Sequence, residues 1–357
     1  MRKIPIWIPI LMSGLLIRIY LLIRMPIWLD EKLTIKLLHH SLSQIINGNL
    51  DYTHPFGYYT FLKIWSFIST NTVWLRLSTI MFFLFNFFLL YQIGNKFYNK
   101  KFSQILIFLY TFSGYFLIFD WQFRMYTGLT TFILISLYLF QSKLTSKNIL
   151  ALFITSLAGL FFDYGFVFYF LPLIIWAWIR TFKEGEENIL TKAFTISISL
   201  LVYAIIWGPN FLSNFREGLG GIEWVKDFTG FSFFTPYFLG FHSNILFSFV
   251  FFGLMVYGVF LNFFRKSFIL SKILFFASSI SLVSSAIISW LFTPFLHVRS
   301  LQIIGITVII FYAHGLLHFF KYRKILAFIF IIFFIINSLI ITIQLPIYPD
   351  KFLITFQ

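Results

Sequence analysis

Apolar runs of about twenty residues constrain this chain more than any other feature of its sequence. Hydrophobic side chains make up 59% of its 357 residues, and charged side chains only 11%. A soluble fold does not need so much apolar surface, so most of the chain is expected to lie in lipid. Backbone polar groups in hydrocarbon must be satisfied within each segment, which predicts an all-α polytopic membrane protein. The sequence has no Cys, which excludes disulfides and thiolate chemistry.

A window of about twenty residues predicts the spanning segments. Eleven spans are expected, at about 5–28, 73–95, 102–119, 125–141, 148–162, 164–180, 192–209, 241–264, 271–293, 300–319 and 325–344. The first run is too long for a cleaved signal peptide and contains Arg18, so we interpret it as a retained helix.

Lysines and arginines between the spans predict the topology. If the ambiguous segment 54–68 lies in the membrane interface, sixteen of the 27 basic residues fall on one side and nine on the other. The positive-inside rule makes the richer side cytoplasmic, with the N-terminus inside and the C-terminus outside. The net charge of +15 is then mostly a topology signal, and no nucleic-acid partner is expected because the cations do not form one patch.

One transmembrane domain is predicted over residues 1–357, without a separate soluble domain. Residues 29–72 form a first outside loop, and residues 210–240 a second. In the first loop, "DEKLTIKLLHHSLSQII" is predicted to be one amphipathic helix lying on the membrane, followed by a second interfacial helix over 54–68.

Two adjacent carboxylates, Asp30 and Glu31, stand where the first span ends. One interpretation makes Asp30 the N-cap of the amphipathic helix and Glu31 a first-turn acid favoured by the helix dipole. The other makes the pair a reaction centre at the membrane surface. The residues themselves leave both open.

Other polar residues at predicted outside helix ends also have two interpretations. His54 and Asp163 suit helix-start and turn chemistry as well as substrate contacts. Arg124 and Arg299 suit interfacial anchors as well as ligands for an anionic headgroup. Arg18 lies within a span, where an ionisable side chain is a functional candidate because its burial is costly unless it is paired.

The order of several short motifs resembles a known family. After Asp30-Glu31 come "THPFGYYTFLKIW", "WLRLSTIMFF", "GNKFYNKK", "DWQFRMY" and, near the end, "HVRSLQIIGITVIIFYAHGLL". Over nearly its full length the chain is similar to the GT-C membrane glycosyltransferases of the protein O-mannosyltransferase and lipid A aminoarabinose transferase branch. It departs from them at Gln122, where relatives often carry Glu, at Asp163-Tyr164 and at Phe56.

The resemblance implies transfer of a sugar from a polyprenyl-phosphate donor to a lipid, glycan or protein hydroxyl, on the outer face of the plasma membrane. It implies Asp30 as the base, Glu31 as its partner, and Arg124 and Arg299 as ligands of the donor phosphate. Arg18 is added to the phosphate ligands because it lies within a span. The candidate substrate contacts are His54, Tyr58, Asp120, Tyr126, Asp163 and Tyr164.

The chemistry suits these residue types. The phosphate leaving group is a weak base, so the reaction needs a base near the acceptor and fixed positive charge at the phosphate. One carboxylate with arginines predicts a single displacement with inversion. No cofactor is expected, and without an Asp-x-Asp sequence no divalent metal is predicted.

Two rival functions share this topology. A transporter or flippase for a lipid-linked sugar would need no base, and it predicts broken helices with polar groups at mid-membrane. An inactive membrane scaffold of the same fold would be expected to lose Asp30 or Arg124, and both are present.

Overall fold

The computed structural model describes residues 5–47, 50–51, 54–184, 187–218, 245–263, 269–291, 299 and 301–348. Within these ranges the chain forms helices and their connections, and no strand. Seven of the described helices are long and apolar enough to cross a membrane: α1 (Trp7–Arg24), α5 (Thr72–Phe97), α10 (Gly165–Glu184), α11 (Glu187–Gly218), α14 (Ile269–Leu291), α15 (Gln302–Tyr322) and α16 (Lys324–Gln344). The described part of the chain is therefore all-helical and has the elements of a membrane protein.

The remaining predicted spans are also helical, and those at 125–141 and 148–162 are shorter helices. Those two and the span at 241–264 correspond to α8 (Tyr126–Gln141), α9 (Ser146–Phe162) and α13 (Ile245–Phe263). The span expected at 102–119 is two helices, α6 (Lys100–Phe112) and α7 (Gly114–Phe119). Ser113 separates them because its backbone is extended, with ψ at 121°. The count of eleven spans and the orientation of the termini stay predictions.

The first loop contains three short helices, α2 (Leu29–Leu38), α3 (Leu42–Asn47) and α4 (Phe56–Trp65). The prediction of one amphipathic helix through "DEKLTIKLLHHSLSQII" was wrong, because the chain breaks between α2 and α3. Ser41 starts the new helix: its Oγ accepts from the Gln44 backbone N–H at 3.2 Å, and its own N–H donates to Gln44 Oε1 at 2.9 Å. This reciprocal cap stabilises a helix start at Ser41.

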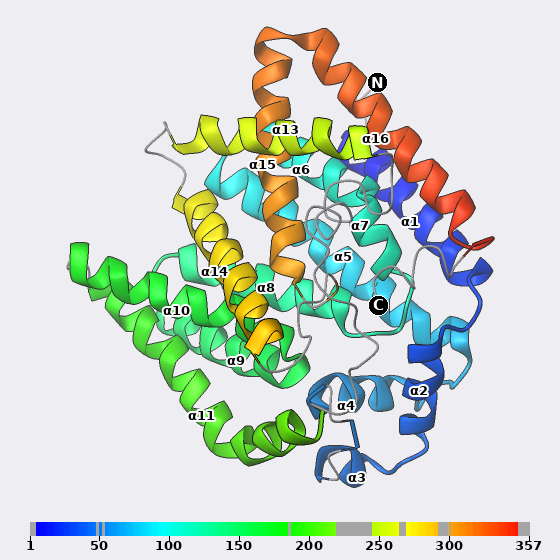
Figure 1. The fold of residues 1–357 in the computed structure, drawn as a ribbon, viewed down its shortest axis with the longest axis vertical. Helices are drawn as coiled ribbons and strands as arrows, with labels where there is room; N and C mark the ends of the chain where they lie inside the picture. Colours follow the sequence, from blue (N-terminus) through cyan, green and yellow to red (C-terminus); the bar gives the residue numbers. More distant parts are fainter. Residues whose placement is uncertain are drawn as a thin grey trace.

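Helix α15 forms the centre of the bundle and packs against α6, α8, α13, α14 and α16 (Figure 1). Helix α5 packs against α6 and α8, which contact α15, and also against α1 and α4. Helices α2, α3 and α4 lie together at one end, at the lower right of Figure 1, and α9, α10 and α11 form a group beside them. Of the second predicted outside loop, residues 210–218 belong to α11, and residues 219–240 lie outside the described part of the chain.

A close helix contact at Gly57 sets the position of α4. A Cβ atom at Gly57 would collide with the backbone carbonyl of Phe161 in α9. Gly57→Ala is therefore expected to push α4 away from α9 and to cost about 1–3 kcal/mol of stability. Gly253→Ala is the matched control, because nothing lies within 4 Å of that Cβ position in α13. Thermal unfolding of both variants in detergent tests this, and equal midpoints would contradict the close contact.

Candidate functional site

A buried ion pair between Glu31 and Arg76 fixes the end of α1 against the start of α2. Arg76 donates to Glu31 through Nε at 3.0 Å and Nη2 at 2.6 Å. Its other N–H groups donate to the backbone carbonyls of Leu22, Met25 and Pro26 at 2.8–2.9 Å. The carbonyls at the end of a helix lack partners within the helix, so Arg76 caps α1 with its side chain.

Glu31 also holds two backbone N–H groups. One of its oxygens accepts from Trp28 at 3.0 Å, and the other from Phe123 at 3.3 Å. The N-cap of α2 is Trp28, so the prediction of Asp30 as N-cap was wrong, whereas Glu31 does lie in the first turn. With its side chain fully buried, Glu31 positions the α2 start and the segment after α7, and it leaves Asp30 as the carboxylate of the pair that reaches solvent.

Asp30 forms an ion pair with Arg299, which lies just before α15. Arg299 Nη1 donates to Asp30 Oδ2 at 2.7 Å, and the two side chains are 16% and 13% exposed. Burial alone would raise the pKa of Asp30, but the charges of Arg299, Arg124 and His54 outweigh it and hold the pKa below its ordinary value. Asp30 is therefore an ionised, accessible carboxylate at neutral pH.

Arg124 lies beside Asp30 in the segment between α7 and α8. Its Nη1 donates to Thr34 Oγ1 at 2.8 Å and to Tyr59 Oη at 3.2 Å, and it lies 3.5 Å from the backbone carbonyl of Asp30. The Tyr59 hydroxyl in turn donates to Asp51. Burial raises the pKa of Tyr59 well above its ordinary value, so Tyr59 stays a neutral donor.

Three buried donors around these arginines have no hydrogen-bond partner within the described residues: Arg124 Nε, Tyr58 Oη and Tyr126 Oη. The charge of Arg124 acts on both hydroxyls, and that of Arg299 acts on Tyr126 as well. The Arg299 guanidinium also lies 5.9 Å from the centre of the Tyr126 ring. Buried polar groups are nearly always paired, so this cluster has the donors that an anionic ligand would satisfy.

His54 and Asp163 lie together at the edge of this cluster. His54 Nδ1 is 3.1 Å from Asp163 Oδ2, and Asp163 Oδ1 accepts from the Gly165 backbone N–H at 2.6 Å. Asp163 thus makes the turn predicted for it and also contacts His54. The neighbouring Tyr164 hydroxyl accepts from Trp207 Nε1 at 3.0 Å. A small pocket opens beside the cluster, and its lining residues are Leu37, Ile45, Leu50, Asp51, His54, Phe56, Tyr59 and Trp207.

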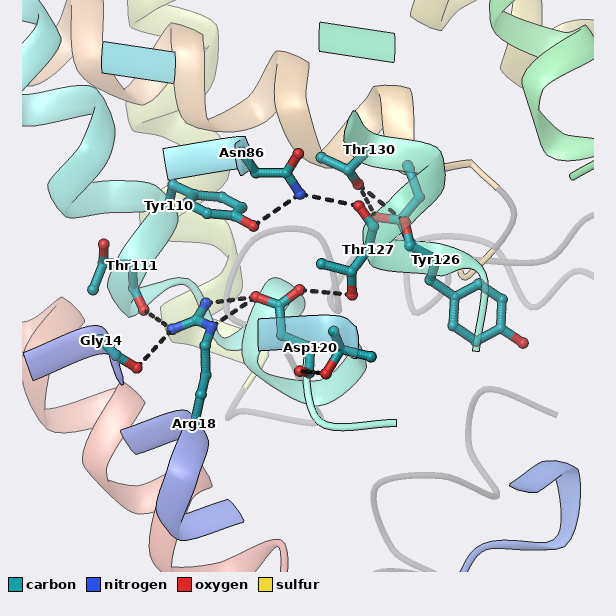
Figure 2. Close-up of polar contacts among 11 residues, drawn as sticks. Gly14, Arg18, Asn86, Tyr110, Thr111, Asp120, Tyr126, Thr127 and Thr130 are labelled. Atoms are coloured by element: carbon teal, nitrogen blue, oxygen red, sulfur yellow. Dashed lines mark hydrogen bonds and ion pairs between the residues drawn. The ribbon is translucent and has the colours of Figure 1, made fainter. Parts of the chain in front are cut away.

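Arg18 and Asp120 form a separate, fully internal pair (Figure 2). Arg18 donates to Asp120 Oδ2 through Nε at 2.9 Å and Nη2 at 2.6 Å, with 0% and 1% of the two side chains exposed. Its Nη1 donates to the carbonyl of Thr111, in the last turn of α6, at 3.1 Å. Thr127 Oγ1 donates to the other Asp120 oxygen at 3.0 Å. These contacts hold α1, α6, α7 and α8 together.

Figure 2 also shows the Tyr126 ring pointing away from Asp120 and its partners. The predicted site residues therefore divide into two groups. The first gathers around Asp30 and contains Glu31, His54, Tyr58, Arg124, Tyr126, Asp163 and Arg299, whereas Tyr164 follows Asp163 and bonds to Trp207 at the edge of this group. Arg18 and Asp120 form the second group, and their buried mutual pairing supports a structural role over contact with a phosphate or substrate.

Sequence reasoning missed Arg76, Thr34 and Tyr59 as parts of the site. Arg76 stands near the start of a predicted span, where an arginine usually anchors the helix at the membrane surface. Only its contacts in the structure show that it is a buried ion-pair partner of Glu31. Thr34 lies one turn after Asp30, a spacing that places both on one face of α2. That spacing was the available signal.

No group of three or more His, Asp or Glu side chains within the described ranges is arranged to hold a metal ion. Independence from metal stays a prediction. Comparison with known proteins found no matching family model, no matching characterised protein and no matching solved structure. A function for this chain is therefore inferred from the site and from the motif resemblance.

Proposed function

We propose that this protein is a membrane glycosyltransferase that uses a polyprenyl-phosphate sugar as donor. The observation that carries the proposal is the position of Asp30. It is a partly exposed carboxylate in contact with Arg299 and beside Arg124, and the three residues come from widely separated parts of the chain. A base and a pair of phosphate ligands are the groups that this transfer needs.

In the proposed reaction, Asp30 accepts the proton of the acceptor hydroxyl as its oxygen attacks the anomeric carbon of the donor sugar. The bond from that carbon to the phosphate oxygen breaks, and its electron pair stays on the phosphate. Arg124 and Arg299 stabilise the second negative charge that the phosphate gains. The Tyr58 and Tyr126 hydroxyls, which have no partner among the described residues, are available as further donors. We assign no chemical step to Glu31, which positions Asp30 through α2.

Placement of the site at the outer surface of a plasma membrane is part of the proposal. It is supported by the positive-inside bias of the sequence and by the short helices α2 to α4 around Asp30. The acceptor is proposed to be a hydroxyl of a lipid, glycan or protein.

The function is tested with purified protein in lipid nanodiscs. A panel of polyprenyl-phosphate sugars is incubated with a lipid and glycan extract of the source membrane, and released polyprenyl phosphate is detected by mass spectrometry. Acceptor-dependent release from one donor is expected. Donor binding without release, together with movement of the donor across the bilayer of proteoliposomes, would indicate the transporter function in its place.

Arg124→Gln is expected to weaken binding of dodecyl phosphate, a simple probe of the phosphate site, by about 10- to 100-fold. The reason is the loss of a charged donor in a buried position, worth about 1.5–3 kcal/mol. Lys36→Gln is the matched control, because it removes an exposed positive charge from α2, the helix that Arg124 contacts. Calorimetric titration measures both affinities. An unchanged affinity in Arg124→Gln would remove Arg124 from the phosphate site.

A further inference from the structure

The proposed base is paired in a way that weakens it. Four charged or titratable side chains face Asp30 from the elements packed around it: Arg299 before α15, Arg124 after α7, His54 before α4 and Tyr126 at the start of α8. Arg299 makes the direct contact, at 2.7 Å. A carboxylate held by an arginine accepts protons poorly, because protonation would break the ion pair.

Arg299 is also one of the two cations assigned to the donor phosphate. The guanidinium is planar, and phosphate binds its N–H groups best through two parallel hydrogen bonds. The Nη1 group that would take part in such binding now donates to Asp30. Arg124 differs, because its contacts are with Thr34, Tyr59 and a backbone carbonyl and none is with the Asp30 carboxylate.

We infer that a phosphate ester entering the site takes Arg299 from Asp30, so that Asp30 becomes a competent base only when the donor is bound. This inference rests on the proposed function and adds a control step to it. In the empty site Arg299 neutralises Asp30 and keeps it in place. In the occupied site the phosphate shares or removes that positive charge, and the carboxylate gains affinity for the acceptor proton.

This exchange of Arg299 between Asp30 and the phosphate also sets the order of the reaction steps. Donor binding precedes activation of the acceptor, since the acceptor proton has a strong base to move to only after the phosphate has bound. Unproductive deprotonation of water or acceptor in the empty site is thereby suppressed.

The test follows the titration of Asp30 directly. Protein labelled with ¹³C at the aspartate carboxyl carbon is placed in nanodiscs, and the Asp30 resonance is assigned by its loss in Asp30→Asn. We expect saturating dodecyl phosphate to move the titration midpoint of Asp30 upward by about one pH unit or more, the usual effect of losing an adjacent opposite charge. In Arg299→Gln, the midpoint is expected to start high and to respond little to the probe. Lys36→Gln should respond as the wild type does.

Binding of the probe is followed separately by its ³¹P resonance. If dodecyl phosphate binds and the titration midpoint of Asp30 in wild-type protein stays unchanged, the inferred exchange of Arg299 is wrong, whereas the assignment of the phosphate site is kept. If dodecyl phosphate does not bind to wild-type protein, the phosphate site of the proposed function fails and the exchange fails with it.

Discussion

Asp30→Asn is expected to reduce sugar transfer by about 10²- to 10⁴-fold, the usual contribution of a positioned general base. The amide has nearly the shape of the carboxylate and can still accept from Arg299, so the site should keep its geometry. Binding of the donor should be unchanged or tighter, because a negative charge beside the phosphate site is removed. Turnover and donor affinity measured on the same nanodisc sample separate these two effects.

Glu187→Gln is the control for that substitution. Glu187 is an exposed carboxylate at the start of α11, and its loss changes the net charge by the same amount. It should transfer sugar at the wild-type rate. Near-normal turnover in Asp30→Asn would show that Asp30 is not the base.

Arg76→Met is expected to lower stability by about 3–5 kcal/mol, the cost of leaving a buried charge without its partner. Glu31 is fully buried, and the same substitution leaves the carbonyls of Leu22, Met25 and Pro26 without their donor. The midpoint of thermal unfolding in detergent should therefore fall well below that of the wild type.

The double variant Arg76→Met with Glu31→Gln distinguishes an unpaired charge from a simple loss of packing. It removes the isolated carboxylate, while the glutamine oxygen can still accept from the Trp28 N–H. We expect it to recover part of the lost stability. A double variant less stable than Arg76→Met alone would contradict a charge-pair origin.

Much of the fold could be predicted because lipid imposes simple rules on sequence. Each apolar run had to be helical, and every predicted span overlaps described helix, although the one at 102–119 is divided between α6 and α7. The breaks were harder to predict, since they depend on single residues within continuous apolar or amphipathic patterns. Ser113 ends α6, and Ser41 starts α3. The sequence does not distinguish either from a serine inside a helix, and only the backbone angles of Ser113 and the hydrogen bonds of Ser41 show the break.

The site could be predicted in part for a related reason. Asp30, Arg124 and Arg299 stand at predicted helix ends on one side of the membrane, so topology alone brings them to the same surface. Which charged side chains form ion pairs depends on the directions in which they point, and the topology does not determine these directions. Arg18 therefore entered the prediction as a phosphate ligand, although it lies against Asp120, and Arg76 was left out, although it holds Glu31.

The configuration of the transferred sugar tests the central claim most directly, once the panel has identified a donor and an acceptor. In a single turnover with donor labelled at the anomeric carbon, NMR of the product reports whether that carbon is inverted. If Asp30 acts as a base in one displacement, the product is inverted and one equivalent of polyprenyl phosphate is released. A retained configuration would mean that a carboxylate first bonds to the sugar, and it would contradict the role assigned here to Asp30.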